Sequence, residues 1–266
     1  MYGLGQPLDN IVLKTERAKK HVLDLETVFE GFLKTKPNAF AFKTDENTGD
    51  RTYYVTRVAP IPIEFSLLVG DALNNIRTAL DHLTYQLVII GGGSNEIRSK
   101  ANFPIGNSLS DYIARRTKMV PGLREDAVKA IDALQPYMGG TGEYFCHLAR
   151  LNNFDKHRLL VPVWGCISGH TALRSDREFL AKFYRKDASD FSAAMMVDKR
   201  TFPKKAGDII LTVPKEDVQE NIQFLFNIMF AEPEIAKGNP IIETLHEMTK
   251  IVRGLIFDFD RLGLFR

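Results

Sequence analysis

Residues 63–90 have the sequence IEFSLLVGDALNNIRTALDHLTYQLVII, which contains the longest helical pattern in the chain. Apolar residues recur in it at every third or fourth position, as they do on the buried face of a helix. This face consists of Phe65, Val69, Ala72, Ile76, Ala79, Leu83, Leu87 and Ile90. Pro60 and Pro62 precede the pattern and Gly91–Gly93 follow it, so a helix is predicted between these borders. The long apolar face requires other helices to cover it.

Three further stretches have the periodicity that such partners need. In addition to residues 63–90, helices are predicted at residues 8–34, 143–158 and 240–263. The first and last helices match in period and length, and the four together predict a core like a four-helix bundle. Two shorter helices, at residues 110–117 and 124–134, are expected to connect them.

Strand patterns occupy the rest of the chain. Residues 39–58 contain two runs of β-branched and aromatic residues around a polar, glycine-containing turn, which predicts a hairpin. Residues 159–230 contain the other expected strands, at 159–167, 179–184, 209–213 and 222–230. In the last of these, apolar residues alternate along the chain, which is typical of a sheet with one buried face. We therefore predict a single α+β domain over residues 1–266, with an antiparallel β-sheet packed beside the four-helix-bundle-like helical core.

Composition limits the setting in which the chain can work. Its 266 residues, 44% of them hydrophobic, are enough to form a full core. The 35 basic and 33 acidic residues give a net charge of +2, so the molecule as a whole is not a general electrostatic trap for nucleic acid. Only two cysteines, Cys146 and Cys166, occur, and no apolar run reaches the roughly 20 residues of a membrane span. We expect a cytoplasmic protein without a membrane segment.

Local clusters of basic residues could still meet phosphate groups. The clusters are Lys14, Arg17, Lys19 and Lys20; Arg115, Arg116 and Lys118; and Lys199, Arg200, Lys204 and Lys205. Such runs are also common on solvated faces of proteins, so both interpretations stay open.

Two polar clusters lie within helices that are otherwise apolar. The first contains Arg77, Asp81 and His82, on a helix whose polar face also carries Asn75 and Thr78. Arg77 and Asp81 are one helical turn apart and can form an ion pair, whereas Arg77 and His82 project about 140° from each other. Buried ionisable groups need partners and are often retained for chemistry, so this helix is a predicted site.

The second polar cluster covers Arg150–Arg158. Asn152 and Asp155 continue the apolar face of their helix and are expected to point inward. An inward aspartate needs a cation or several hydrogen-bond donors. Alternatively, Asp155 caps the end of the helix while His157 and Arg158 interact with the helix dipole. We predict that the two helices pack side by side, because each polar face then supplies partners for the other.

The segments Gly70–Leu83 and Leu148–Arg158 resemble segments of uncharacterised bacterial and phage proteins, and they are similar to the HEPN (higher eukaryotes and prokaryotes nucleotide-binding) superfamily of helical bundles. In the ribonuclease members of that superfamily, an arginine is followed after four to six intervening residues by a histidine, and the pair attacks RNA without a metal ion, often at a dimer interface. The resemblance implies two such catalytic pairs, namely Arg77 with His82 and Arg150 with His157. The supporting residues that it implies are Asn75, Thr78, Asp81, Asn152, Asp155 and Arg158.

Three functions remain open. The first is RNA or nucleotide binding, with a metal-independent ribonuclease reaction in which a histidine takes the 2′-hydroxyl proton and an arginine stabilises the charge at phosphorus. The second is a metal site made of Asp81, His82, Asp155 and His157, although their spacing matches no recognised ligand pattern. The third is a non-catalytic dimerising or regulatory protein whose polar clusters fix helix register. The expected partners are RNA or a nucleotide and a second copy of the chain, and no cofactor or resident metal is expected.

Overall fold

The computed structural model describes residues 7–157, 160–161, 163–171, 194–196, 205–218, 222–231 and 239–266. The chain divides into two compact units. The helical unit consists of Met1–Thr27, Ile63–Pro162 and Glu232–Arg266, and the strand unit consists of Val28–Pro62 and Val163–Ala231. Helices and antiparallel strands are both present, which confirms the predicted α+β class. That residues 1–266 form a single domain remains a prediction.

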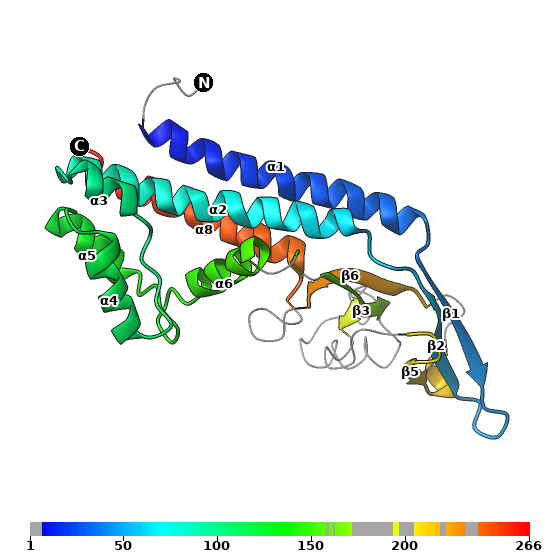
Figure 1. Cartoon of the computed structure of the whole chain (residues 1–266). Coiled ribbons are helices and arrows are strands. Elements are labelled where there is room, and N and C mark those ends of the chain that lie inside the picture. Colours follow the sequence, from blue (N-terminus) through cyan, green and yellow to red (C-terminus); the bar gives the residue numbers. More distant parts are fainter. Residues whose placement is uncertain are drawn as a thin grey trace. The chain divides into compact units, whose positions relative to one another are not determined.

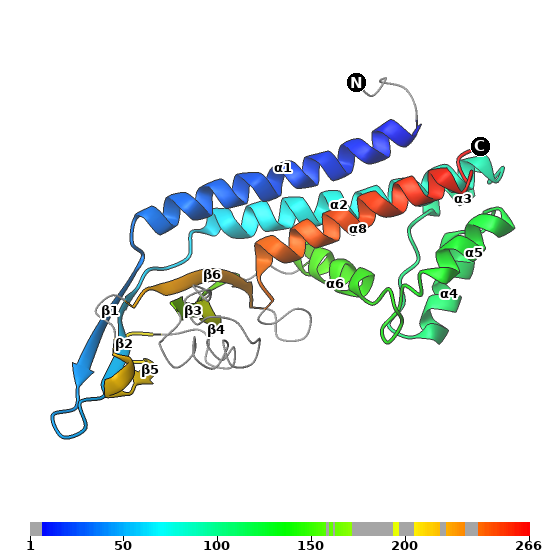
Figure 2. The same cartoon turned by 180° about the vertical axis from the view of Figure 1, so that it is seen from behind.

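Long helices form the core of the helical unit. Helix α2 (Ile63–Ile90) has the bounds predicted from the sequence, and it packs against α8 (Ile241–Arg261) and α6 (Tyr144–His157). Helix α1 (Pro7–Lys34) runs beside α2 in both views (Figure 1, Figure 2). Every residue on the predicted apolar face of α2 except Ile90 is buried. The helices that carry the two polar clusters therefore pack side by side, as predicted.

Charged residues join α1 to α8 within this unit. The Nε2 atom of His246 lies 2.8 Å from the carboxylate of Glu26, and Arg253 forms an ion pair with Glu16. The pattern of four- and three-residue steps predicts an apolar face on α1, and its residues Ile11, Thr15, Ala18, Val22 and Leu25 are buried. Val12 and His21 are also buried, whereas Phe29 and Phe32, further along the same face, are half-buried. Leu262, which continues the apolar spacing of the last helix, lies just beyond α8 and is 65% exposed. The periodicity therefore identifies most of the core of both helices and fails toward their C-terminal ends.

Three short helices follow α2 in the chain. Helix α3 (Asn95–Lys100) is not predicted from the sequence, because its single turn and a half contains too few apolar residues to show a period. Helices α4 (Leu109–Met119) and α5 (Glu125–Ala133) correspond to the two predicted connecting helices. The hydroxyl of Tyr112 on α4 donates a hydrogen bond to Asp132 on α5, which holds these two helices together.

The glycines after α2 end the helix for steric reasons. A Cβ atom on Gly91 would lie 2.0 Å from the carbonyl oxygen of Gly122, and Gly92 has a φ angle of 77°. Glycine alone permits both the close backbone approach and the left-handed conformation at low cost. These residues therefore let the chain that follows α4 approach the end of α2.

The strand unit contains two three-stranded antiparallel sheets among its described residues. The first has the order β1-β2-β5 and consists of β1 (Asn38–Thr44), β2 (Arg51–Val58) and β5 (Ile209–Val213). The second has the order β4-β3-β6 and consists of β4 (Ala194–Met196), β3 (Val163–Thr171) and β6 (Phe224–Phe230). Strands β1 and β2 are the predicted hairpin. The strand predicted at residues 179–184 lies outside the described residues.

Aromatic side chains connect the two sheets of the strand unit. The ring of Phe224 on β6 lies 4.8 Å from the ring of Phe40 and 5.7 Å from the ring of Tyr53, between ring centroids. Tyr53 and Val213 are buried in the first sheet, and Phe224 packs against them. The sequence predicts one sheet, whereas two sheets share an aromatic core here, because alternation identifies strands and does not identify their pairing partners.

Candidate functional site

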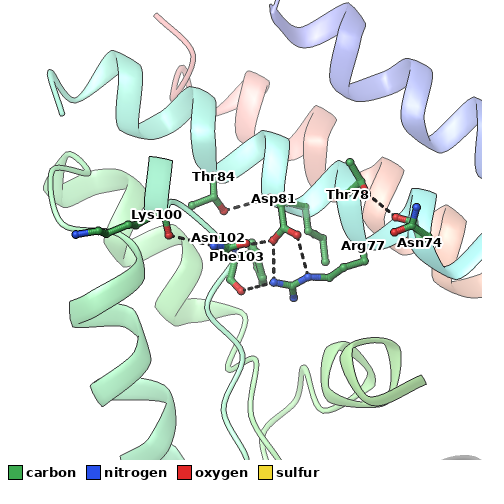
Figure 3. A network of polar contacts seen from close by, with 9 residues as sticks. Asn74, Arg77, Thr78, Asp81, Thr84, Lys100, Asn102 and Phe103 are labelled. Carbon is green, nitrogen blue, oxygen red and sulfur yellow. Dashed lines mark hydrogen bonds and ion pairs between the residues drawn. The ribbon is translucent and has the colours of Figure 1, made fainter. Parts of the chain in front are cut away.

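Arg77 and Asp81 form the central contact of the first polar cluster (Figure 3). The guanidinium donates from Nη2 to Asp81 Oδ1 over 2.7 Å and from Nε to Asp81 Oδ2 over 3.2 Å. Both residues also bind the backbone of Phe103, because Nη2 donates to its carbonyl oxygen and its N–H donates to Asp81 Oδ1. The ion pair predicted from helix spacing is therefore confirmed, and it ties the segment after α3 to α2.

Asp81 lies between two pockets of the helical unit. The larger one, of about 810 Å³, is lined by residues of α1, α2 and α3, and we call it the basic pocket. The smaller one, of about 350 Å³, is lined by residues of α2, α4 and α6 and of the segment after α3, and we call it the Arg77 pocket. Asp81 lines both pockets, and Arg77 lines only the smaller one.

The basic pocket contains three cations without acidic partners. Lys14 and Arg17 come from α1, and Arg98 comes from α3. Within the described residues none of the three forms an ion pair, and the Nε atom of Arg98 is buried without a hydrogen-bond partner. Asp81, the one carboxylate among the described residues that line this pocket, is already bound to Arg77. The pocket therefore has an excess of positive charge, which suits an anionic ligand.

His82 lies in the basic pocket and has a lowered pKa. Its side chain is exposed, yet partial burial lowers its pKa below the ordinary value of 6.5. The charge of Lys14 lowers this pKa further, and the charge of Asp81 raises it. The neutral imidazole therefore predominates at neutral pH, and this is the form that accepts a proton in general base catalysis.

The structure places Arg77 and His82 in different pockets. Five residues of helix turn one side chain away from the other by about 140°, so Arg77 faces α6 while His82 faces α1. The cations that accompany His82 come instead from other helices, at Lys14, Arg17 and Arg98.

The other predicted residues of α2 bond to their own helix. Asn75 lines the basic pocket and donates from Nδ2 to the carbonyl oxygen of Asp71 over 2.8 Å. The Thr78 hydroxyl donates to the carbonyl oxygen of Asn74 over 2.7 Å. Such bonds satisfy polar side chains on a helix without a partner from another element.

The predicted residues of α6 lie in several environments. Arg150 donates to Oδ1 of Asn107 over 2.9 Å and lines neither described pocket. Asn152 is 2% exposed and lines the Arg77 pocket. The side chain of His157 and the whole of Arg158 lie outside the described residues. Of this cluster, the structure therefore brings Asn152 together with Arg77 and Asp81.

Asp155 lies against α2 at Gly70, far from the Arg77–Asp81 pair. A Cβ atom on Gly70 would lie 2.5 Å from Asp155 Oδ1, so the missing side chain of this glycine makes room for the carboxylate. Positions 70 and 81 are about 16 Å apart along the helix. Burial raises the pKa of Asp155, a hydrogen bond from the backbone N–H of Val161 lowers it, and the charge of Asp71 raises it. Asp155 thus contacts the backbone just after the end of α6, and its role in capping that helix remains a prediction.

Replacing Asp155 by asparagine is expected to stabilise the protein at neutral pH. The raised pKa means that the folded state disfavours the charged carboxylate, so its ionised form destabilises the fold at pH values above that raised pKa. This destabilisation decreases as the pH falls through the raised pKa and disappears below the ordinary value of 3.8, because the carboxyl is then protonated in both states. We expect a gain of about 1 kcal/mol in the free energy of unfolding at neutral pH and almost none at about pH 3.5.

Chemical denaturation at the two pH values measures this gain. Asp24→Asn is the matched control, because Asp24 is exposed and pairs only with Lys20. A loss of stability in Asp155→Asn at neutral pH would contradict the expectation and show that the charge stabilises the fold.

Arg98 is the pocket residue that the sequence does not indicate. It lies on α3, a helix too short to show periodicity, and a single arginine in a polar segment carries no spacing signal. Lys14 and Arg17 belong to a basic cluster that is visible in the sequence, but the pattern does not distinguish a pocket from a solvated face.

Metal ligands, membrane-spanning helices and a reactive thiol are further features that bear on function. Among the described residues, no three His, Cys, Asp or Glu side chains are grouped as metal ligands would be, and no helix there is long and apolar enough to cross a membrane. Cys146 is buried, donates to the carbonyl oxygen of Gly106 over 3.3 Å, and has a pKa raised by burial to about 11. A thiol with such a raised pKa is a poor nucleophile at neutral pH.

Comparison of the chain with models of known protein families, with curated proteins and with solved structures gives no match. Function must therefore be inferred from the two pockets and the side chains that line them.

Proposed function

We propose that the protein binds RNA in the basic pocket and cleaves it without a metal ion, with His82 as the general base. The observation that carries this proposal is an imidazole of lowered pKa in a pocket with three cations that have no acidic partner among the described residues. RNA has one group that a neutral imidazole can deprotonate and another that cations can bind. Its 2′-hydroxyl supplies a proton to the base, and its phosphate accepts hydrogen bonds from the cations.

In the proposed reaction, His82 removes the proton of a 2′-hydroxyl group. The 2′-oxygen then forms a bond to the adjacent phosphorus while the bond from phosphorus to the 5′-oxygen breaks, which leaves a cyclic phosphate. The departing 5′-oxygen takes a proton from water. Lys14, Arg17 and Arg98 stabilise the negative charge that develops on the phosphate oxygens. The HEPN resemblance assigns that role to an arginine of the same helix, and we assign it to cations of neighbouring helices.

Two further properties of the basic pocket support a nucleic-acid ligand. Tyr85 lines it and is 39% exposed, so its ring is available for stacking against a base. The volume of about 810 Å³ lies in the range of small-molecule sites, and it accommodates a nucleotide unit rather than a single ion.

A non-catalytic regulatory function is the second candidate. It is supported by the Arg77–Asp81–Phe103 contacts, which hold the segment after α3 against α2 and leave the Arg77 guanidinium outside the basic pocket. For either function we also propose a homodimer in the cytoplasm, because the HEPN resemblance implies a dimer interface and RNA is an intracellular partner.

Binding of a single-stranded RNA of about 12 nucleotides, measured by fluorescence anisotropy, tests the proposed pocket. Arg17→Ala and Arg98→Ala are each expected to weaken binding about 5- to 10-fold, because each removes a charged hydrogen-bond donor worth about 1 kcal/mol. Each should also lower the slope of log affinity against log salt by about 0.7, the value for one phosphate contact of a single strand.

Arg261→Ala is the matched control. Arg261 is 78% exposed at the end of α8 and lines neither described pocket, so its removal changes the net charge equally without touching the site. Equal affinities for Arg17→Ala, Arg98→Ala and the wild type would contradict the proposal. Adenosine monophosphate in the same assay separates an RNA site from a nucleotide site, because tighter binding of the mononucleotide would reject RNA as the ligand.

A further inference from the structure

The Arg77 pocket contains two buried polar atoms for which the described part of the chain supplies no partner. They are Nη1 of Arg77 and Oδ1 of Asn152, and both residues line the pocket. Arg77 uses Nε and Nη2 to bind Asp81 and Phe103, and Figure 3 shows its remaining nitrogen pointing away from both. Asn152 is 2% exposed, so its amide is held almost completely inside the protein. One atom is a donor and the other is an acceptor.

Leaving these two atoms unpaired is unfavourable. Each unsatisfied buried polar group costs about 1–3 kcal/mol, and nearly all such groups in folded proteins have partners. A ligand that accepts a hydrogen bond from Arg77 and donates one to Asn152 would satisfy both. One bound water molecule does not fill the pocket, because the pocket volume of about 350 Å³ far exceeds the roughly 30 Å³ of a water molecule. Phe103, Ile105 and Met119 add apolar side chains to the lining, which suits the carbon atoms of a larger ligand.

The charges around the Arg77 pocket favour an anion. Lys156 is exposed at its rim, and no ion pair of this lysine exists among the described residues. Arg115 also lines the pocket, 43% exposed, and binds Asp111 through Nε. Asp81, the carboxylate of the pocket, is neutralised by Arg77. Cationic donors therefore outnumber the free acceptors, and an anion with several acceptor oxygens complements them.

We infer that the Arg77 pocket binds a small oxyanion, a carboxylate or a phosphate ester, that also carries a hydroxyl or amine group. The anionic oxygens accept hydrogen bonds from Nη1 of Arg77 and from Lys156. The hydroxyl or amine donates to Oδ1 of Asn152, and the carbon skeleton contacts Phe103 and Met119. The lining residue that this site shares with the basic pocket is Asp81, and the inference does not rest on RNA binding in the basic pocket.

Isothermal titration calorimetry with glycerate, glycerol 3-phosphate and glycerol tests this inference. The two anions share the hydroxyl groups and differ in the oxyanion, so their relative affinities distinguish a carboxylate site from a phosphate site. At least one of them is expected to bind with a Kd below about 1 mM, and uncharged glycerol is expected not to bind. The absence of binding by both anions up to about 10 mM would overturn the inference.

Variants then locate the bound anion. Asn152→Leu keeps the branched shape of the side chain and removes the unpaired amide oxygen, so we expect binding to weaken at least about 10-fold while Tm stays close to that of the wild type. Lys156→Gln is expected to weaken binding about 3- to 5-fold. Lys250→Gln removes the same charge from a side chain that is 81% exposed and outside both described pockets, and it should leave the affinity unchanged.

Asn152→Asp is the second variant at this position. Its carboxylate adds a negative charge to the pocket that Arg77 lines, so it should repel the anion. Wild-type affinity in Asn152→Leu or Asn152→Asp would overturn the inference. Arg17→Ala, in the basic pocket, should leave the affinity for both anions unchanged, and a loss of binding in this variant would show that the anion occupies the basic pocket instead.

Discussion

Replacing Asp81 by alanine is expected to lower the free energy of unfolding by about 2–4 kcal/mol. The substitution leaves Nε and Nη2 of Arg77 without a carboxylate and the N–H of Phe103 without its acceptor. The Arg77 side chain is only 13% exposed, so water cannot fully replace the lost partner. The loss is smaller than for a completely buried pair, because Asp81 is 25% exposed.

Chemical denaturation followed by circular dichroism measures this loss. Asp24→Ala is the matched control, because Asp24 forms the same one-turn ion pair with Lys20 on an exposed face, and we expect it to change stability by less than about 0.5 kcal/mol. The loss of stability in Asp81→Asn should lie between the losses in Asp81→Ala and Asp24→Ala, because its amide oxygen can still accept the hydrogen bond from the N–H of Phe103. A loss in Asp81→Ala no larger than in Asp24→Ala would show that the pair does not stabilise the fold.

Replacing His82 by alanine is expected to lower RNA cleavage by about 100-fold or more while Tm stays close to that of the wild type. The side chain is exposed in the basic pocket, so its removal eliminates the proposed base without creating a cavity in the core. Cleavage of a fluorescent RNA in the presence of EDTA measures the effect. His147→Ala is the matched control, because His147 lies on α6 and lines neither described pocket.

The pH profile supplies an independent test of His82 as the base. Because its pKa is lowered, the cleavage rate should rise with pH through a value below 6.5 and level off at neutral pH. His157→Ala is expected to show a similar loss if the second predicted pair contributes, although the side chain of His157 lies outside the described residues. Unchanged cleavage in both variants, or complete loss of wild-type cleavage in EDTA, would reject the proposed mechanism. Loss of folding in His82→Ala, with no cleavage by the wild type, would favour the non-catalytic function.

Hydrophobic periodicity predicted the helices of the fold well. The α2 helix has its predicted bounds, and its apolar face is buried up to Leu87. A repeat of apolar residues over many turns identifies a helix reliably, because one residue that departs from the spacing does not hide the period. Helix α3 could not be found in this way, since its few residues complete fewer than two turns. The two sheets could not be separated either, because β5 pairs with β2 from a distant part of the chain and nothing in the alternation indicates that choice.

The candidate site was predictable only where its contacts are local. The Arg77–Asp81 pair follows from one-turn spacing, and the inward position of Asn152 follows from the apolar face of its helix. The residues that line the basic pocket together with His82 do not follow from such rules, because Lys14 and Arg98 belong to other helices. Which side chains line a pocket together depends on how the helices pack. Periodicity predicts which face of a helix is buried, but it does not predict which other helix covers that face.

Asp81 belongs to both pockets, and this shared wall links the binding equilibria of their proposed ligands. An anion bound at Nη1 of Arg77 shares the positive charge of the guanidinium with Asp81 and leaves the carboxylate less neutralised. A less neutralised Asp81 raises the pKa of His82, because its charge already acts on that imidazole in this direction. Thermodynamic linkage requires that RNA in the basic pocket alter the affinity for the anion by the same factor. If both proposals hold, a small anion in the Arg77 pocket shifts the pH range of RNA cleavage without contacting the RNA.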